Sequence, residues 1–386
     1  MGLIDITVVS SATELDRHAA AWNRLAARSP QCAPMLSYPW IATYVEHRLR
    51  EREAWCCVLA YEGDELVGAL PLVHSTRRAG PLAYQALRAP HDNHTISVGP
   101  LVASGRSHEV IEHLLAAARK HYPRHFRIEL KRLPASSPIW TLTQTPAHRM
   151  LAIRRFRGVG AYLPVPEDFA AFRAGLSRNF RNNLNKAGNK LRKRGQVSVE
   201  FLTGADATAS DLPRFMRVEA ANWKGERGTA IQSSPELVRF YTALVQRLSQ
   251  AGWLEWHFLE ADGVTLAANF AVRLGRVLLL WKLGYDQAYR RLSPGSLLME
   301  RLIERCAADP SVAEINLMTD QPWYDNWQMQ KRACYDLDLY PWQPGPLVLG
   351  YGAARVRELA RGFPLAERAI AKLKTLGPIQ AARAPE

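Results

Sequence analysis

Residues 281–298 read Trp-Lys-Leu-Gly-Tyr-Asp-Gln-Ala-Tyr-Arg-Arg-Leu-Ser-Pro-Gly-Ser-Leu-Leu, and this stretch decides the fold. An apolar strand is expected to lead into a basic loop, and the loop opens a helix at Ser293-Pro294-Gly295-Ser296. Backbone N–H groups in the first turn of a helix have no intrahelical partner, and the helix dipole adds positive potential there. The stretch therefore predicts a pocket for a phosphate group.

The composition is that of an ordinary globular protein with a basic surface. The chain has 386 residues, of which 47% are hydrophobic and 22% charged, so it holds enough apolar material for two or three domains. With 50 Lys and Arg against 36 Asp and Glu, the net charge is +14. Such a charge favours an anionic partner, whether nucleic acid, an anionic membrane or a phosphorylated small molecule. A basic surface without a dedicated partner explains the charge equally well.

The cysteines and the N-terminus predict the compartment. Five cysteines occur without a Cys-x-x-Cys pair, which favours a reducing environment with neither disulfides nor a structural zinc site. Residues 1–5 show no basic segment followed by an apolar one, and no apolar stretch reaches the roughly 20 residues of a membrane helix. No metal, triphosphate or serine-nucleophile motif is visible. We therefore expect a cytoplasmic protein without a bound metal.

The order of predicted elements occurs twice along the chain. The first half is expected to hold a strand, two helices, a hairpin across Glu62-Gly63-Asp64, and then further strands and a helix. The second half repeats this order, with its hairpin across Asp262-Gly263. The Pro-, Ser- and Thr-rich segment 134–146 is the expected boundary. This predicts an α/β fold with domains at 1–150 and 151–340, followed by a linker and helical tail at 341–386.

The second half resembles a GNAT acyltransferase. In that superfamily the pattern Arg/Gln-x-x-Gly-x-Gly/Ala, between the fourth strand and the third helix, holds the pyrophosphate of acetyl-CoA. Here Arg290 and Gly295 keep the outer positions of the pattern, and Ser293 stands at its first glycine. The resemblance implies two tandem GNAT-like domains, each a mixed, mostly antiparallel sheet flanked by helices. The C-terminal domain would bind acyl-CoA, and the degenerate N-terminal domain would shape the acceptor side.

A narrower resemblance is to the acetyltransferases associated with cellulose and exopolysaccharide biosynthesis. It rests chiefly on residues 285–289 and 292–298, and that family has a tandem GNAT-like fold close to the Fem-type aminoacyltransferases. The motif that usually ends the domain in that family is Gly, then Tyr-Lys, then Trp. In the segment 320–327, Tyr324 and Trp327 keep their places, whereas aspartates replace the glycine and the lysine.

The resemblance implies a set of site residues. Amides of the fourth strand would hold the thioester and the loop would hold the pyrophosphate, which assigns cofactor binding to Leu283, Gly284, Tyr285, Arg290, Arg291, Ser293, Gly295 and Ser296. Acyl transfer also needs a proton donor for the leaving thiolate and a base for the acceptor. Tyr324 is the predicted acid, and Asp286 and Asp320 are the candidate bases. The candidate substrate contacts are Lys282, His257 and Trp223.

These residues also have structural interpretations. Ser293 is a possible helix N-cap, and Tyr324 is able to pack beside its neighbouring tryptophans. Asp286 can serve only to fix a turn, and His257 can be a satisfied core histidine. Lys282 lies in an apolar strand, where an unpaired ammonium is costly, so it lines the groove or pairs with a carboxylate such as Asp286.

A basic amphipathic helix is expected near the start of the second half. Residues 173–195 carry eight Lys and Arg and no acid. Three interpretations stay open: a solvated face, a contact with an anionic acceptor, CoA phosphate or membrane glycolipid, and a contact with the acceptor stem of a charged tRNA. No ordered set of aromatic residues accompanies the charges, so nucleic-acid sequence readout is not expected.

The sequence leads to one predicted function and two alternatives. We expect an acyltransferase that uses acetyl-CoA or another acyl-CoA, without a metal. Its acceptor would be the amine or hydroxyl of a sugar or of a cell-envelope or polysaccharide precursor, attacking the thioester directly. A Fem-type transferase using aminoacyl-tRNA is the first alternative. A non-catalytic accessory protein of polysaccharide export, held at an anionic membrane by its basic tail, is the second.

Overall fold

The computed structural model describes residues 3–79, 82–144, 150–221 and 228–361. The first half contains β1 (Ile4–Val9), α1 (Ala12–Arg17), α2 (Ala19–Arg28), α3 (Tyr38–His47), β2 (Ala54–Glu62), β3 (Glu65–Ala79), β4 (Leu82–Arg88), β5 (Leu101–Val102), α4 (Ser107–His121) and β6 (His125–Pro134). The second half contains β7 (Met150–Pro164), α5 (Phe169–Gly175), α6 (Arg178–Arg192), β8 (Val197–Thr203), α7 (Leu212–Ala220), α9 (Pro235–Gln250), β9 (Leu254–Ala261), β10 (Val264–Leu274), β11 (Val277–Tyr285), α10 (Pro294–Ala307), β12 (Glu314–Asn316) and β13 (Gln330–Pro341).

Short helices complete the chain. They are η1 (Pro34–Leu36), η2 (Pro138–Gln144), η4 (Gly204–Asp206), η5 (Ala209–Asp211), η6 (Ile231–Ser233), η7 (Gln287–Leu292), η8 (Pro322–Trp327), η9 (Pro346–Gly352) and, at the end of the described chain, α11 (Ala353–Arg361). The predicted tail past residue 361 lies outside the described residues. In the part of the chain that the structure describes, no helix is both long and apolar enough to cross a membrane.

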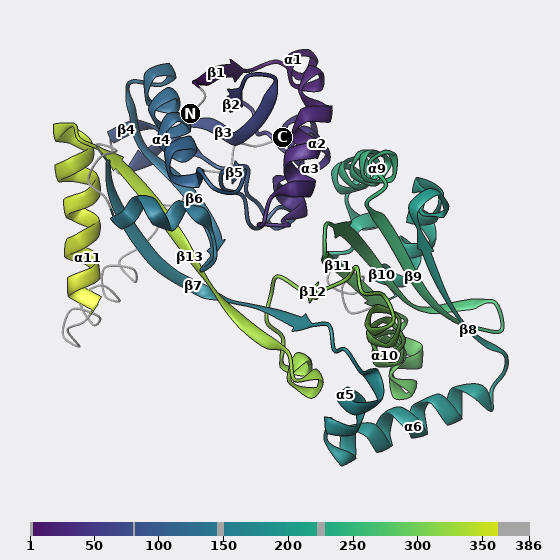
Figure 1. The fold of residues 1–386 in the computed structure, drawn as a ribbon. Helices are drawn as coiled ribbons and strands as arrows, with labels where there is room; N and C mark the ends of the chain where they lie inside the picture. The colour runs from purple at the N-terminus through teal and green to yellow at the C-terminus, as the bar shows by residue number, and fades with distance from the viewer. Residues whose placement is uncertain (1–2, 80–81, 145–149, 222–227, 362–386) are drawn as a thin grey trace, which may run out of the picture.

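The described strands form one 13-stranded mixed sheet (Figure 1). Its order is β1-β2-β3-β4-β6-β13-β7-β12-β11-β10-β9-β8, with β5 paired to β3. Only β4 with β6 and β11 with β12 pair in parallel; the other neighbours are antiparallel. The predicted α/β fold, with mixed and mostly antiparallel sheets flanked by helices, is confirmed. The two sheets that we expected are joined edge to edge.

Strand β13 is the element that joins the halves. Although it comes late in the sequence, it pairs with β6 of the first half on one side and with β7 along its full length on the other. The sequence did not predict β7 or β13, because their pairing partners lie far along the chain and arginines interrupt their apolar alternation. The boundary near residue 150 falls at the first residue of β7, and the domain limits stay a prediction.

Local sequence explains the hairpin between β9 and β10. Asp262 and Gly263, between β9 and β10, have φ of 50° and 76°, the left-handed conformation that a tight hairpin turn requires. The Asp262 carboxylate also accepts a hydrogen bond from the backbone N–H of Gln196 at 2.8 Å, which ties the turn to the start of β8. Small buried residues follow in β10 and let helices α7 and α10 pack on its two faces.

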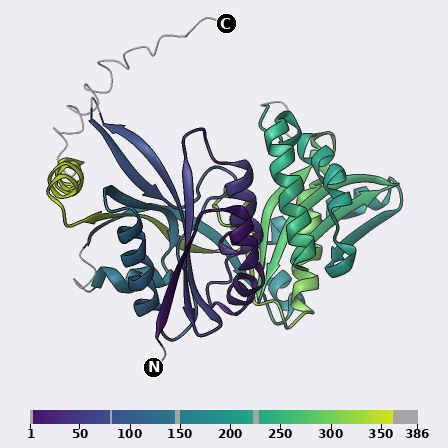
Figure 2. The ribbon, with the colours of Figure 1, turned by 90° about the horizontal axis from the view of Figure 1, so that it is seen from above.

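The halves also meet through helices (Figure 2). Helix α3 of the first half packs against α9 of the second. Arg247 on α9 donates to Thr43 at 3.0 Å, and Arg48 donates to Glu236 at 2.6 Å. A ring contact between Trp40 and Trp281, with centroids 5.4 Å apart, extends this contact to the sheet. The first half therefore forms part of the surroundings of β11.

We expect the joining strand to carry much of the stability. Leu337 on β13 is fully buried, so Leu337→Ala should lower the free energy of unfolding by about 3 kcal/mol through lost burial and the cavity left behind. Leu359→Ala removes the same atoms from a side chain that is 68% exposed, and it should change stability by less than about 0.5 kcal/mol. Urea unfolding of both variants measures the difference; equal effects would contradict a structural role for β13.

Candidate functional site

The pairing of β11 with β12 ends early and opens a cleft. The two strands pair in parallel only from Val277 to Leu279, opposite residues 314–316. Residues 280–285 continue beside β10, while the chain after β12 turns away. Between them lies a cleft of about 610 Å³, lined on the side of β12 by Leu317, Thr319 and Tyr324. We treat this as the candidate site, because it is large enough for a small-molecule ligand.

A β-bulge lies in β11 at the mouth of the cleft. Ala271 of β10 pairs with Leu280 and Phe270 pairs with Lys282, so Trp281 is an extra residue without a partner in the register. Such a bulge changes the direction in which the following side chains point. The indole Nε1 of Trp281 donates to the hydroxyl of Tyr241 at 3.2 Å, which fixes this bulge against α9.

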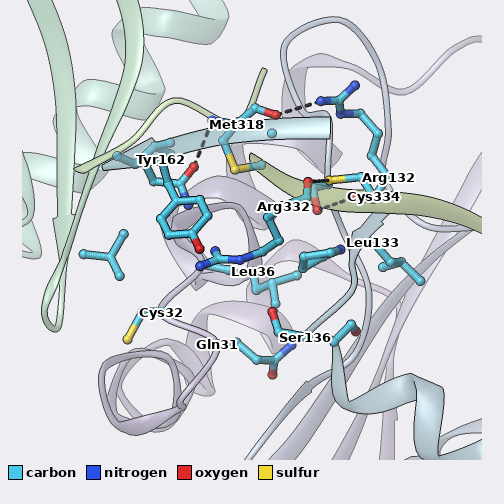
Figure 3. Close-up of a pocket in the computed structure, with 18 of the residues that line it drawn as sticks. Gln31, Cys32, Leu36, Arg132, Leu133, Ser136, Tyr162, Met318, Arg332 and Cys334 are labelled. Atoms are coloured by element: carbon cyan, nitrogen blue, oxygen red, sulfur yellow. Dashed lines mark hydrogen bonds between the residues drawn. The ribbon is translucent and has the colours of Figure 1, made fainter. Parts of the chain in front are cut away.

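The opposite wall is held by the first half of the chain. Met318, just past β12, has a φ of 59°, and its carbonyl accepts a hydrogen bond of 2.7 Å from Nη2 of Arg132 on β6. Gly160 on β7 permits the approach, because a Cβ there would lie 2.9 Å from that carbonyl oxygen. Figure 3 shows Arg132 and Met318 in a second, smaller cavity between the halves. Both of its cations already have partners: Arg332 pairs with Glu314 at 2.8 Å, and Arg132 donates to backbone carbonyls.

The floor of the cleft is the N-terminus of α10. Ser293 has φ 47° and ψ 48°, a left-handed conformation that normally favours glycine. It occupies the N-cap position, but its side chain makes no capping hydrogen bond. Ser293, Gly295 and Ser296 all line the cleft beside Pro294. The serine therefore adopts a backbone conformation that glycine favours.

Most of the predicted cofactor-binding residues come together here. Leu283, Gly284, Tyr285, Arg290, Ser293, Gly295 and Ser296 line the cleft, whereas Arg291 is exposed and lies outside the lining. Gly284 is needed for close packing, because a Cβ there would lie 3.1 Å from the backbone of Glu219 on α7. Gly295 is different: a Cβ there would lie 3.8 Å from the Tyr285 ring, so this position opens onto the cleft.

Tyr324 lines the cleft from η8. Its side chain is only 4% exposed, and burial raises the pKa of its phenol to about 12, with the nearby charge of Asp320 adding to the shift. The phenol is therefore protonated at neutral pH and is able to donate a proton into the cleft. Its ring also packs against Trp323, with centroids 4.3 Å apart. Tyr324 therefore both packs beside a neighbouring tryptophan and lines the cleft.

The two candidate bases are placed differently. Asp286 caps η7: its carboxylate accepts from the N–H of Ala288 at 2.9 Å, and it does not line the cleft. Asp320 forms an ion pair with Lys331 at 3.0 Å, and Asp325 shares that lysine at 3.2 Å. The Oδ1 atom of Asp320 is buried without a hydrogen-bond partner. The neighbours of Asp320 on both sides line the cleft, so only this candidate adjoins it.

Lys282 lines the cleft next to the bulge. Its carboxylate partner is Glu219 at 3.9 Å, not Asp286 as we suggested. Glu219 is 1% exposed, and its other oxygen accepts from the N–H of Ile231 at 2.9 Å. The ammonium also lies 5.3 Å from the centre of the Tyr241 ring. A buried carboxylate thus holds this cation at the wall of the cleft.

The other two predicted substrate contacts are not in the cleft. His257 is fully buried and forms a 3.1 Å contact with Glu255, which also accepts from Arg305. Burial lowers the pKa of the His257 imidazole, despite the opposing effect of Glu255. It is a core histidine with a partner, as the structural interpretation proposed. Trp223 lies outside the described residues.

Sequence reasoning missed several lining residues. Asn269 of β10 lines the cleft and is 5% exposed. Its signal was a single amide inside the apolar run Leu-Ala-Ala-Asn-Phe-Ala-Val, since buried polar side chains are usually partnered or functional. Glu219 gave no comparable signal, because its contact with Lys282 spans a long stretch of chain. No group of three His, Cys, Asp or Glu able to hold a metal occurs within the described ranges.

Comparison with known proteins finds one matching domain family and several structures with a similar fold. Residues 178–327 match the family described as an acetyltransferase (GNAT) domain. No curated protein sequence matches the chain. The crystal structure of FemX is 11% identical over 86% of this chain and 96% of that chain, with a TM-score of 0.59. The C-terminal domain of a putative lysylphosphatidylglycerol synthetase from Agrobacterium fabrum is 12% identical over 88% and 95%, with a TM-score of 0.50. Such identities establish the fold alone.

The left-handed conformation at Ser293 makes a testable prediction. Ser293→Val places a β-branched side chain at positive φ, which should lower the free energy of unfolding by about 1–2 kcal/mol. Ser293→Gly relieves the strain and should be neutral or stabilising. Thermal or urea unfolding distinguishes the two variants. A valine variant as stable as the glycine variant would show that the loop conformation is not required for folding.

Proposed function

We propose that this chain is a GNAT-type acyltransferase that transfers an acyl group from acyl-CoA to an amine or hydroxyl, as the match of residues 178–327 to a GNAT acetyltransferase domain and the structural similarity to FemX support. Acetyl-CoA is the first choice of donor. The supporting observation is the α10 N-terminus, where Arg290, Ser293 and Gly295 face one cleft together with the unpaired edge of β11. A cation and a helix N-terminus at one place favour a pyrophosphate.

The proposed binding mode follows from the lining. The pyrophosphate would lie against the first turn of α10, near Arg290. The pantetheine arm would run along residues 281–285, whose edge toward β12 has no strand partner. The thioester would then reach the region between the Lys282 and Tyr324 side chains. Bound acyl-CoA supplies an activated carbonyl and a thiolate leaving group.

The protein's own groups would handle the protons. The acceptor nitrogen or oxygen attacks the carbonyl carbon, the C–S bond breaks, and the phenol of Tyr324 gives its proton to the departing sulfur. The proton of the acceptor passes to the free Oδ1 of Asp320 or to water. Solvent exchange then returns the proton to Tyr324. Lys282 contributes positive potential where negative charge develops on the carbonyl oxygen.

The acceptor is proposed to be a small molecule or a glycan, namely a sugar or a cell-envelope or polysaccharide precursor. This proposal rests on the narrower sequence resemblance in residues 285–298. The first half supports both sides of the cleft, because Arg132 holds the Met318 carbonyl and Trp40 packs against Trp281 of β11, so it is suited to shape the acceptor side. A cytoplasmic location and a peripheral contact with an anionic membrane stay predictions.

Transfer from an aminoacyl-tRNA is the second candidate. The observation that favours it is the cationic surface of α6, whose exposed basic residues include Arg178, Lys186, Lys190 and Arg192. Figure 1 shows α6 at the edge of the second half, where its apolar face packs on α10 and its cationic face is exposed to a large ligand. The similarity to FemX concerns the fold and does not decide between the two donors.

Two adjacent arginines provide a matched test of the donor site. Arg290→Gln removes a cation from the cleft lining and should weaken acetyl-CoA binding about tenfold, the effect of one lost charge-assisted hydrogen bond. Arg291→Gln changes the same residue type outside the lining and should bind as the unaltered protein does. Gly295→Trp should abolish binding, because the indole would project into the cleft.

Calorimetry with acetyl-CoA measures these affinities, and release of free thiol with an amino-sugar acceptor measures turnover. Equal losses in the Arg290 and Arg291 variants, or no acetyl-CoA binding by the unaltered protein, would contradict the proposed donor site. Transfer that requires aminoacyl-tRNA and is abolished by ribonuclease would support the second candidate instead.

The predicted acid makes a separate test. Tyr324→Phe keeps the ring and removes the proton donor, so kcat should fall by about 10²–10⁴-fold while acetyl-CoA affinity is unchanged. Because the phenol pKa is raised to about 12, it stays protonated across the neutral and mildly basic range. Ionisation of Tyr324 should therefore cause no loss of rate below about pH 10. A variant with unchanged kcat would exclude Tyr324 as the acid.

A further inference from the structure

A second cationic cavity lies in the first half of the chain, next to helix α3. Its volume is about 760 Å³, and its cationic lining residues are Arg48, Arg50, Arg77, Arg88 and Lys131. Three acids, Asp92, Glu129 and Glu236, line it as well. None of its residues takes part in the donor site described above. We call it the α3 cavity.

Three of these cations are already neutralised by carboxylates. Arg48 pairs with Asp92 at 2.7 Å and with Glu236 at 2.6 Å. Arg88 pairs with Glu53 at 2.7 Å, and Lys131 lies 3.5 Å from a carboxylate oxygen of Asp336. These residues build a rigid cationic frame. They do not by themselves require a ligand.

The remaining cations are different. Among the described residues, neither Arg50 nor Arg77 forms an ion pair with a carboxylate. The Nε atom of Arg77 is buried without a hydrogen-bond partner, and so is the Nδ1 atom of His91, which also lines the cavity. Buried polar atoms are nearly always partnered in folded proteins. Because a guanidinium nitrogen only donates, the unpartnered Nε of Arg77 in this basic hollow points to a missing acceptor group with negative charge.

The α3 cavity shares a wall with the transfer cleft. His94 lines the cavity, and its Nδ1 lies 2.9 Å from the hydroxyl of Tyr241. The same hydroxyl accepts from Nε1 of Trp281, the bulge residue that lines the transfer cleft. Because an indole only donates, the Tyr241 hydroxyl keeps its own proton for Nδ1 of His94. The imidazole is then neutral, with its N–H on Nε2.

The charge state of His94 is consistent with that arrangement. Burial, together with the positive charge of Lys282, lowers the pKa of this imidazole to about 4. The link between the two hollows is geometric, because the Tyr241 hydroxyl contacts both His94 and Trp281. At neutral pH the wall between them carries a neutral ring.

We propose that the α3 cavity is the acceptor subsite and that it binds a phosphate or carboxylate group of the acceptor through Arg50 and Arg77. The acceptor role rests on the proposed acyl transfer. An acceptor held by its anionic end in this cavity would place its other end along the wall formed by His94, Tyr241 and Trp281, beside the thioester. The donor pyrophosphate has its own cation, Arg290, in the transfer cleft.

The binding test uses defined anions. Calorimetry is carried out with inorganic phosphate, glucosamine 6-phosphate and glucuronate on the unaltered full-length chain, on Arg50→Gln/Arg77→Gln, and on the control Arg78→Gln. Arg78 is exposed, neighbours Arg77 and does not line the cavity. The double variant should bind about 100-fold more weakly, about tenfold for each lost charge-assisted contact, and the control should bind normally. The phosphate and glucuronate arms distinguish the two anionic groups.

Two binding results would overturn the proposal: no binding of any of the anions by the unaltered chain, or equal affinity in the double variant and the control. Thermal unfolding shows whether the double variant folds. If it does not, the single variants Arg50→Gln and Arg77→Gln replace it, each with an expected loss of about tenfold.

A turnover test separates this proposal from acyl transfer itself. With acetyl-CoA as donor, kcat/KM for glucosamine 6-phosphate should exceed that for glucosamine, and the double variant should remove the preference. Equal kcat/KM for both sugars in the unaltered chain would overturn the acceptor role while acyl transfer stands. If the chain binds anions through these arginines but does not bind acetyl-CoA, both acyl transfer and the acceptor role are contradicted. The anion-binding site would still be supported.

Discussion

The early end of the pairing between β11 and β12 is the constraint on which the site depends. Past Leu279 the ladder is not continued, and two local features keep it open. On one strand the bulge at Trp281 redirects the backbone, and on the other side the left-handed Met318 is held through its carbonyl by Arg132. A continued ladder would place backbone where the cleft now lies. The opening of the cleft is therefore built into the sheet.

Both features depend on the first half of the chain. Arg132 belongs to β6, which reaches the second half because β13 lies between β6 and β7. The bulge residue packs against Trp40 of α3 and donates to Tyr241 of α9, two helices that pack on each other. A C-terminal domain without its partner would lose both supports. Within the described ranges, the first half therefore supports the geometry of the cleft without lining it.

The sequence predicted what is local and missed what is long-range. The start of α10 at Pro294 and the turn at Asp262 depend on adjacent residues, and both lie where the sequence places them. Strands β7 and β13 were missed because each is stabilised mainly by the other across the intervening chain. The predicted partner of Lys282 was wrong for the same reason: Asp286 is near in sequence, but Glu219 on α7 is near in space. Nothing in a local pattern distinguishes these two carboxylates.

Asp320 and Tyr324 form a coupled pair within the proposed reaction. The negative charge of Asp320 contributes to the raised pKa of Tyr324, so it helps to keep the phenol protonated before transfer. If Oδ1 of Asp320 accepts the proton of the attacking group, that charge disappears, and with it part of the pKa shift. Tyr324 then becomes a stronger acid at the step in which the thiolate leaves. Lys331, paired with Asp320 and Asp325, holds this arrangement in place. Asp320, which stands where the resembled family has glycine, would thus make Tyr324 more acidic only after the acceptor has lost its proton.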